Sequence, residues 1–200
     1  MDFWRYNTIC FEDIPENEFL NVNLKESKAA HFSNMEIEYL IAWYHKTKMG
    51  SPFSITKPAI LKYLELNCSN TNDFEGIEKC IGLKRLELHY CIKLLNDRGI
   101  SSVADTLVHL HINQSKKFRI TDEIMKLKNL RVLCLNSCGE IDDLSFLNAF
   151  PKLIDFRFVD TKVINGDLSP IVNHPTIRSA GYMNMRNYNI NDIEMKRLLL

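Results

Sequence analysis

The sequence has no excess of charge of either sign. Lys plus Arg total 25 and Asp plus Glu total 25, so the formal net charge is zero. Non-specific binding to nucleic acid depends on a surplus of positive charge. We therefore expect no nucleic-acid partner.

Long apolar runs are also missing. The chain contains no stretch of 18 or more apolar residues, which a membrane-spanning helix would need. Its start, MDFWRYNTICFEDI, has acids where a secretory signal would have a positive region followed by an apolar one. We expect a cytoplasmic protein with no membrane association.

Common catalytic motifs are absent as well. The chain has no G-x-S-x-G, H-E-x-x-H, P-loop or G-x-G-x-x-G sequence, and each of these would have indicated a defined reaction or cofactor. The Ser, His and Asp residues are scattered through a repeated pattern that already accounts for many of them. We expect a protein that is not an enzyme and that needs no cofactor.

No two cysteines have the C-x-x-C spacing of a common structural zinc site. The six cysteines are Cys10, Cys68, Cys80, Cys91, Cys134 and Cys138. Cys91 and Cys138 recur at one register of the repeat, as buried small side chains do, whereas secreted disulfide scaffolds are usually shorter than about 100 residues. These features predict reduced, mostly buried thiols.

What the sequence does contain is a repeat of the pattern LxxLxL. The six segments are LKYLEL at 61, LKRLEL at 83, LVHLHI at 107, LRVLCL at 130, LIDFRF at 153 and IRSAGY at 177. Successive segments start 22 to 24 residues apart. This regularity predicts one structural unit that is used about six times.

The spacing within a unit predicts its geometry. Residues at positions 1, 4 and 6 would point into a narrow core, and residues at positions 3, 5 and 7 would alternate outward along a short strand. Position 9 is small or polar in most units, which suits a bend after the strand, and position 12 is apolar in five of six. The fold class predicted is an α/β solenoid with a parallel sheet on its concave face.

These units resemble leucine-rich repeats over residues 61–188. CIKLLNDRGISSVADTL is similar to the continuation of cysteine-containing repeats, and the tail after residue 155 is similar to that of small bacterial leucine-rich repeat proteins encoded beside polymorphic toxin genes. The resemblance implies a protein-binding module, specifically an immunity protein that neutralises a cognate toxin. The alternative that it implies is an adaptor or substrate-receptor scaffold.

Residues 1–60 and 189–200 would cap the repeats, because terminal units otherwise expose apolar faces. FWRYNTICF and FLNVNLK suggest a hairpin, and Ser33 with Glu36 has capping-box spacing that predicts a helix over 34–47. An alternative makes Ile37, Leu40 and Ala42 one more unit, 24 residues before Leu61. At the other end, NDIEMKRLLL predicts a short helix opened by Asn191, or a frayed tail.

The outward positions of the strands are the candidate partner-binding site. Tyr and Arg are common energetic anchors of interfaces, so Tyr63, Arg85 and Arg157 are the leading candidates, and truncating them should weaken binding without unfolding the chain. The full set of candidate residues is Tyr63, Glu65, Arg85, Glu87, His89, His109, His111, Asp155 and Arg157. The partner expected is a protein, specifically a toxin domain.

The histidines on this face allow a second interpretation. His89, His109 and His111, with Glu87 or Cys134, could surround a metal ion or act as a pH switch. Side chains on one face of a sheet lie roughly 5 Å apart without necessarily converging. We therefore expect ordinary hydrogen-bonding histidines and no metal.

Overall fold

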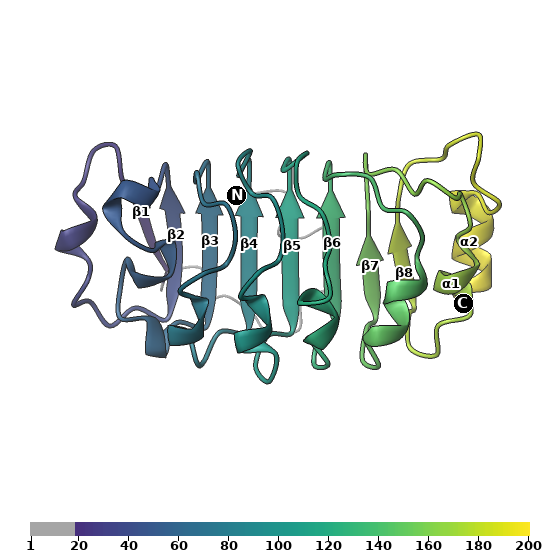
Figure 1. Ribbon diagram of the computed structural model, residues 1–200. Coiled ribbons are helices and arrows are strands. Elements are labelled where there is room, and N and C mark those ends of the chain that lie inside the picture. The colour runs from purple at the N-terminus through teal and green to yellow at the C-terminus, as the bar shows by residue number, and fades with distance from the viewer. Residues whose placement is uncertain (1–18) are drawn as a thin grey trace.

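The computed structural model describes residues 19–200, which form one eight-stranded, all-parallel sheet with the strands in chain order (Figure 1). The strands are β1 (Leu20–Asn23), β2 (Tyr39–Trp43), β3 (Tyr63–Asn67), β4 (Arg85–His89), β5 (His109–Asn113), β6 (Val132–Asn136), β7 (Asp155–Arg157) and β8 (Ser179–Gly181). From β2 onward, successive strands begin 22 to 24 residues apart. The chain is therefore a solenoid-like stack of similar segments.

Short helical turns connect the strands, and those that follow β3 to β7 lie on one face of the sheet (Figure 1). The turns are η2 (Ala29–His31), η3 (Thr47–Met49), η4 (Pro52–Ser54), η5 (Pro58–Ile60), η6 (Ile77–Lys79), η7 (Ile100–Val103), η8 (Ile124–Lys126), η9 (Ser145–Ala149) and α1 (Ser169–Val172). Within residues 19–200, no helix has the length and apolar character needed to cross a bilayer.

The core lies between the sheet and these turns, and it is built from positions 1, 4 and 6 of each segment. Leu64, Leu86, Leu110 and Leu133 lie opposite one another on neighbouring strands and are completely buried. Burying a leucine side chain contributes roughly 1.5–3 kcal/mol, so the leucine rows are the main stabilising feature. The predicted inward positions are confirmed.

In three segments, the position 9 side chain closes the bend after the strand with a hydrogen bond to a carbonyl of the preceding segment. Cys91 Sγ donates to the carbonyl of Leu66 (3.7 Å), and Cys138 Sγ donates to that of Ile112 (3.5 Å). Burial raises the pKa of both thiols to about 12. The five described cysteines are free thiols, as expected, and Cys10 lies outside the described residues.

The predicted helix over 34–47 is wrong, because this segment contains strand β2. Leu40 and Ala42 lie opposite Leu64 and Leu66 of β3, which is the alternative register. Glu36 forms an ion pair with Lys57 (2.8 Å) instead of closing a capping box. Pairing with β3 supplies the backbone hydrogen bonds and buries Leu40, which outweighs the local helix signal.

Only the second arm of the predicted N-terminal hairpin lies within the described residues. FLNVNLK contains β1, which pairs in parallel with β2. The other predicted arm, residues 3–11, lies outside the described residues. The sheet continues without a break across residue 60, where the sequence predicted the boundary between cap and repeats.

The C-terminal helix is confirmed as α2 (Asp192–Leu198). The Asn191 side chain accepts a hydrogen bond from the Glu194 backbone N–H (2.9 Å), as an N-cap residue does. Met195 is buried on its inner face. The helix therefore covers the last strand and protects that edge of the sheet (Figure 1).

A left-handed residue follows each of six strands at position 8. These residues, with φ between 48° and 60°, are Tyr44, Cys68, Tyr90, Gln114, Ser137 and Asp160. The Tyr90 N–H donates to the carbonyl of Asn113 (3.0 Å), and the other N–H groups through Ser137 bond the next segment in the same way. This conformation continues the ladder by one residue before the chain turns away.

At this position a glycine variant of the protein should be more stable than an alanine variant. We expect the free energy of unfolding to be about 1 kcal/mol higher for Tyr90→Gly than for Tyr90→Ala, because alanine is strained at positive φ. Urea denaturation of the two variants measures this difference. The same pair at Lys84, which precedes β4, should show the usual preference for alanine, and a preference for alanine at both positions would contradict the prediction.

Candidate functional site

The nine candidate residues share one face of the sheet, opposite the leucine core. Tyr63, Arg85 and His109 lie side by side across β3, β4 and β5. Glu65, Glu87 and His111 form the next row, and His89, Asp155 and Arg157 belong to the same face of β4 and β7. We call this surface the polar face. The sequence correctly predicted that these residues lie on the same face of the sheet.

The expectation that this face is exposed is wrong. Eight of the nine residues are between 0% and 5% exposed, and the Arg157 side chain, at 26%, is the exception. All-parallel sheets are generally buried on both faces, and the strand period shows which residues share a face without showing whether the face is open. Truncating these residues should therefore cost stability.

Glu87 is the centre of the polar face. Its Oε1 accepts hydrogen bonds from Arg85 Nε (2.6 Å), and its Oε2 accepts one from His89 Nε2 (2.9 Å). His111 Nδ1 lies 3.6 Å from Oε2. A buried carboxylate is tolerated when several donors surround it, and Glu87 has donors on both oxygens.

An asparagine fixes the proton on His111. The Val159 N–H donates to Asn136 Oδ1 (2.9 Å), so the Asn136 amide N–H₂ must face His111 Nε2 (3.1 Å). His111 Nε2 is therefore an acceptor, and its proton lies on Nδ1, toward Glu87. On the other side, the Asn113 amide lies 3.3 Å from His89 Nδ1.

The electrostatics follow from this arrangement. Burial raises the pKa of Glu87, but the Arg85 guanidinium and the two histidine hydrogen bonds outweigh it, and the pKa lies well below its usual range. Burial lowers the pKa of His109 well below its usual range, and the Arg85 charge adds to this effect. Burial also lowers the pKa of His111. The centre is therefore an ionised carboxylate beside a guanidinium, and the nearby His109 and His111 imidazoles are kept neutral by burial.

Separate ion pairs and hydrogen bonds occupy the two ends of the polar face. Tyr63 Oη and Asn67 Nδ2 both donate to Glu65. Arg157 Nε donates to Asp155 Oδ2 (2.9 Å). The polar face is thus three neighbouring networks across the sheet, and each contains one of the buried carboxylates.

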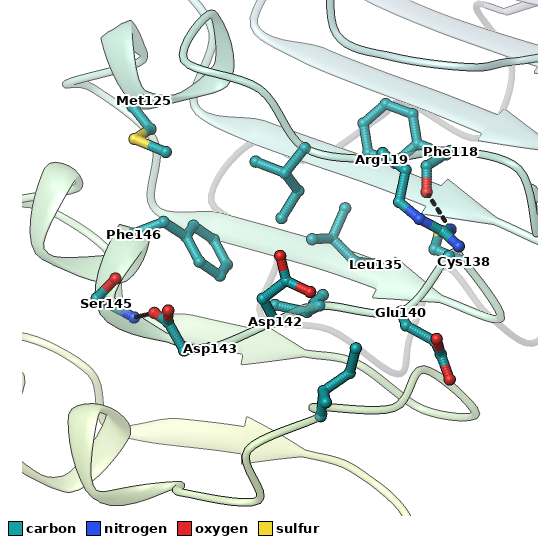
Figure 2. A pocket seen from close by; sticks show the side chains of 14 residues that line it. Phe118, Arg119, Met125, Leu135, Cys138, Glu140, Asp142, Asp143, Ser145 and Phe146 are labelled. Atoms are coloured by element: carbon teal, nitrogen blue, oxygen red, sulfur yellow. Dashed lines mark hydrogen bonds between the residues drawn. The ribbon is translucent and has the colours of Figure 1, made fainter.

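An open pocket lies elsewhere, between the loops that follow β5, β6 and β7, and we call it the loop pocket (Figure 2). It has a volume of about 470 Å³. Phe118, Leu135, Ile141 and Phe146 form its apolar lining, and Glu140, Asp142, Asp143 and Arg119 supply charge. Figure 2 shows the Asp142 carboxylate beside Leu135, in the middle of the pocket.

Local backbone features shape the loop pocket. A Cβ on Gly139 would lie 2.3 Å from the carbonyl oxygen of Phe118, so only glycine allows the two loops to approach this closely. Val163 pairs with Ile141 and is buried in the core. Ile164 is 45% exposed at the pocket wall.

The sequence prediction did not identify the loop pocket. The acidic run GEIDDLS in the fourth unit was the available signal, but the apolar lining comes from three different units. The chain matches no protein-family model and no curated protein.

Proposed function

We propose that this chain is a non-catalytic protein-binding module of the leucine-rich repeat type. The buried leucine rows, the strand spacing of 22 to 24 residues and the position 9 hydrogen bonds support this assignment. Solenoids of stacked repeats offer extended surfaces that recognise other proteins. The partner we favour is a toxin domain that the protein neutralises as an immunity protein.

The observation that carries the proposal is the composition of the loop pocket. Acidic side chains of Glu140, Asp142 and Asp143 adjoin an apolar lining and the exposed Ile164. Apolar side chains together with charged ones are typical of a protein interface, and complementary charge speeds association. The segment that fits this pocket is a loop of the partner with an apolar side chain beside a Lys or Arg.

The polar face has a different part in this proposal. Contact with a partner through Tyr63, Arg85 or Arg157 stays a prediction, and of these three Arg157 has the most exposed side chain. The loop pocket offers exposed apolar and acidic groups together in the folded chain. The first contact with the toxin would therefore form there.

Affinity for the partner tests the proposal. The partner would be captured from the native cell with the tagged chain and identified by mass spectrometry, and its affinity measured by titration calorimetry. Asp142→Lys combined with Ile164→Asp should weaken binding more than about tenfold. The first substitution reverses a charge in the loop pocket, and the second removes an apolar contact. The salt dependence of the association rate should also decrease.

Ile193→Asp provides the matched control, since Ile193 is 61% exposed on α2, away from the loop pocket. It should leave the affinity unchanged. Equal affinities for both variants would remove the loop pocket as the binding site. A stoichiometric ubiquitin-ligase or signalling complex in place of a toxin would favour the adaptor alternative.

A further inference from the structure

His109 has a polar atom that the hydrogen bonds of the polar face do not use. Its Nε2 is buried and has no hydrogen-bond partner within residues 19–200, although the residue is only 3% exposed. Leaving a buried polar group unsatisfied destabilises the folded chain. Such an atom in a rigid strand is a candidate ligand.

Two other ligand-forming side chains lie beside it. One ligand atom each from His109, His111 and Cys134 lie within 4.8 Å of one another, and all three side chains are buried. His109 and His111 come from β5 and Cys134 from β6, where it lies directly opposite His111. Cys134 Sγ has no hydrogen bond to any residue of the described chain.

From these contacts we propose that His109, His111 and Cys134 form a binding site for one divalent cation of the zinc class. Two imidazole nitrogens and a sulfur are donors that zinc prefers. At zinc–ligand distances of about 2.0–2.3 Å, the donors of a tetrahedral site lie roughly 3.3–3.6 Å apart. Because the ligand atoms lie within 4.8 Å of one another, their separations need to shorten by about 1.5 Å at most, which side-chain rotations can supply.

Glu87 already holds His111 in the orientation that a metal ligand needs. Metal-bound histidines usually donate their second N–H to a carboxylate, which fixes the tautomer. The proton of His111 lies on Nδ1, toward Glu87, and its Nε2 lone pair faces the Asn136 amide. The cation would replace this amide at Nε2 and leave the bond to Glu87 in place.

A second group, Glu87, His89 and His111, is equally close. Its atoms are already engaged with one another, because the Glu87 carboxylate accepts from His89 and lies near His111 Nδ1. Binding a cation there would disrupt the hydrogen bonds of the Glu87 carboxylate. The site that includes His109 would displace only the Asn136 amide, and it would provide a partner for an atom that has none.

Charge balance and protons are consistent with the proposed site. Binding removes the thiol proton of Cys134, which passes to the buffer, so the bound ion and thiolate together carry one positive charge. Burial raises the pKa of Cys134 well above its usual range, and the nearby Asp155 charge adds to this effect. Affinity should therefore rise with pH, and the Glu87 and Asp155 carboxylates offset the Arg85 and Arg157 charges around the ion.

Cobalt titration of the full chain, purified and freed of metal with a chelator, tests the site. We expect a thiolate-to-cobalt charge-transfer band that saturates at one ion per chain, and zinc should raise the melting temperature. Cys134→Ser should abolish the band and weaken zinc binding more than about tenfold, and His109→Gln should weaken zinc binding by a similar factor.

Cys80→Ser is the control, because this buried cysteine donates to the Phe53 carbonyl, outside the polar face. It should retain the band. Circular dichroism verifies that each variant is folded. An absent band in the unmutated chain, or a band that persists in folded Cys134→Ser, would overturn the proposal whether or not any partner protein is found.

Discussion

Replacing Glu87 by Gln should destabilise the chain by about 3–5 kcal/mol, the typical cost of removing one partner of a buried ion pair. The substitution keeps the size of the side chain but removes its charge and turns one oxygen into a donor. Arg85 would lose an ion pair of 2.6 Å, and the N–H groups of His89 and His111 would face an amide. Urea denaturation at pH 7.5 measures the loss.

Glu78→Gln is the matched control, because Glu78 is exposed on η6 and surface charges contribute little. Its unfolding midpoint should be close to that of the unmutated chain. If Glu87→Gln is equally mild, the carboxylate does not hold the centre of the polar face together. A Glu87→Gln variant that folds but is destabilised would show that the polar face contributes to the stability of the fold.

The sequence predicted the core of the fold well, because the core depends on a pattern that every segment repeats. Leucines such as Leu86 and Leu110 recur at the same register, and the parallel sheet follows from stacking that register. The incorrect prediction of a helix over 34–47 has a local cause. Ser33 and Glu36 provide a helix-start signal, and the pairing of β2 with β3 that overrides it is a contact between distant residues.

The candidate site was predicted only in part, for a physical reason. The alternation along β4 placed Arg85, Glu87 and His89 on one face, because the strand period requires it. Burial of that face depends on tertiary packing, which the period does not encode. The loop pocket was missed because Phe118, Phe146 and Ile164 come from three loops whose approach depends on details such as Gly139.

Acidification should also destabilise the chain strongly, starting near pH 6.5. The pKa values of His109 and His111 are lowered in the folded state, so the unfolded chain takes up protons there that the folded chain does not. Stability is therefore complete above the unfolded pKa of about 6.5 and falls as the pH decreases. Burial also lowers the pKa values of His45 and His174, and each such group adds up to about 1.4 kcal/mol per pH unit to the slope.

The charged and titratable neighbours of these two histidines determine how far this loss extends. Arg85, Glu87 and His89 adjoin them from β4, and Cys134 adjoins them from β6. The pKa of Glu87 is lowered in the folded state, so its contribution is present above about pH 4.5 and is lost as the pH falls further. Carboxylate and histidines thus act in the same direction, in successive pH ranges.

Urea midpoints between pH 8 and pH 4.5, measured with a chelator present, test this dependence. The midpoint should be constant above about pH 7.5 and fall steeply below about pH 6.5. His109→Gln removes one of these groups, so the slope of the unfolding free energy between pH 6 and pH 5 should fall by about 1.4 kcal/mol per pH unit. His31→Gln, at an exposed histidine, should leave the slope unchanged. A flat midpoint from pH 7 to pH 5 would mean that the imidazoles gain protons as readily in the folded chain as in the unfolded one, and the polar face would then have to be open to water.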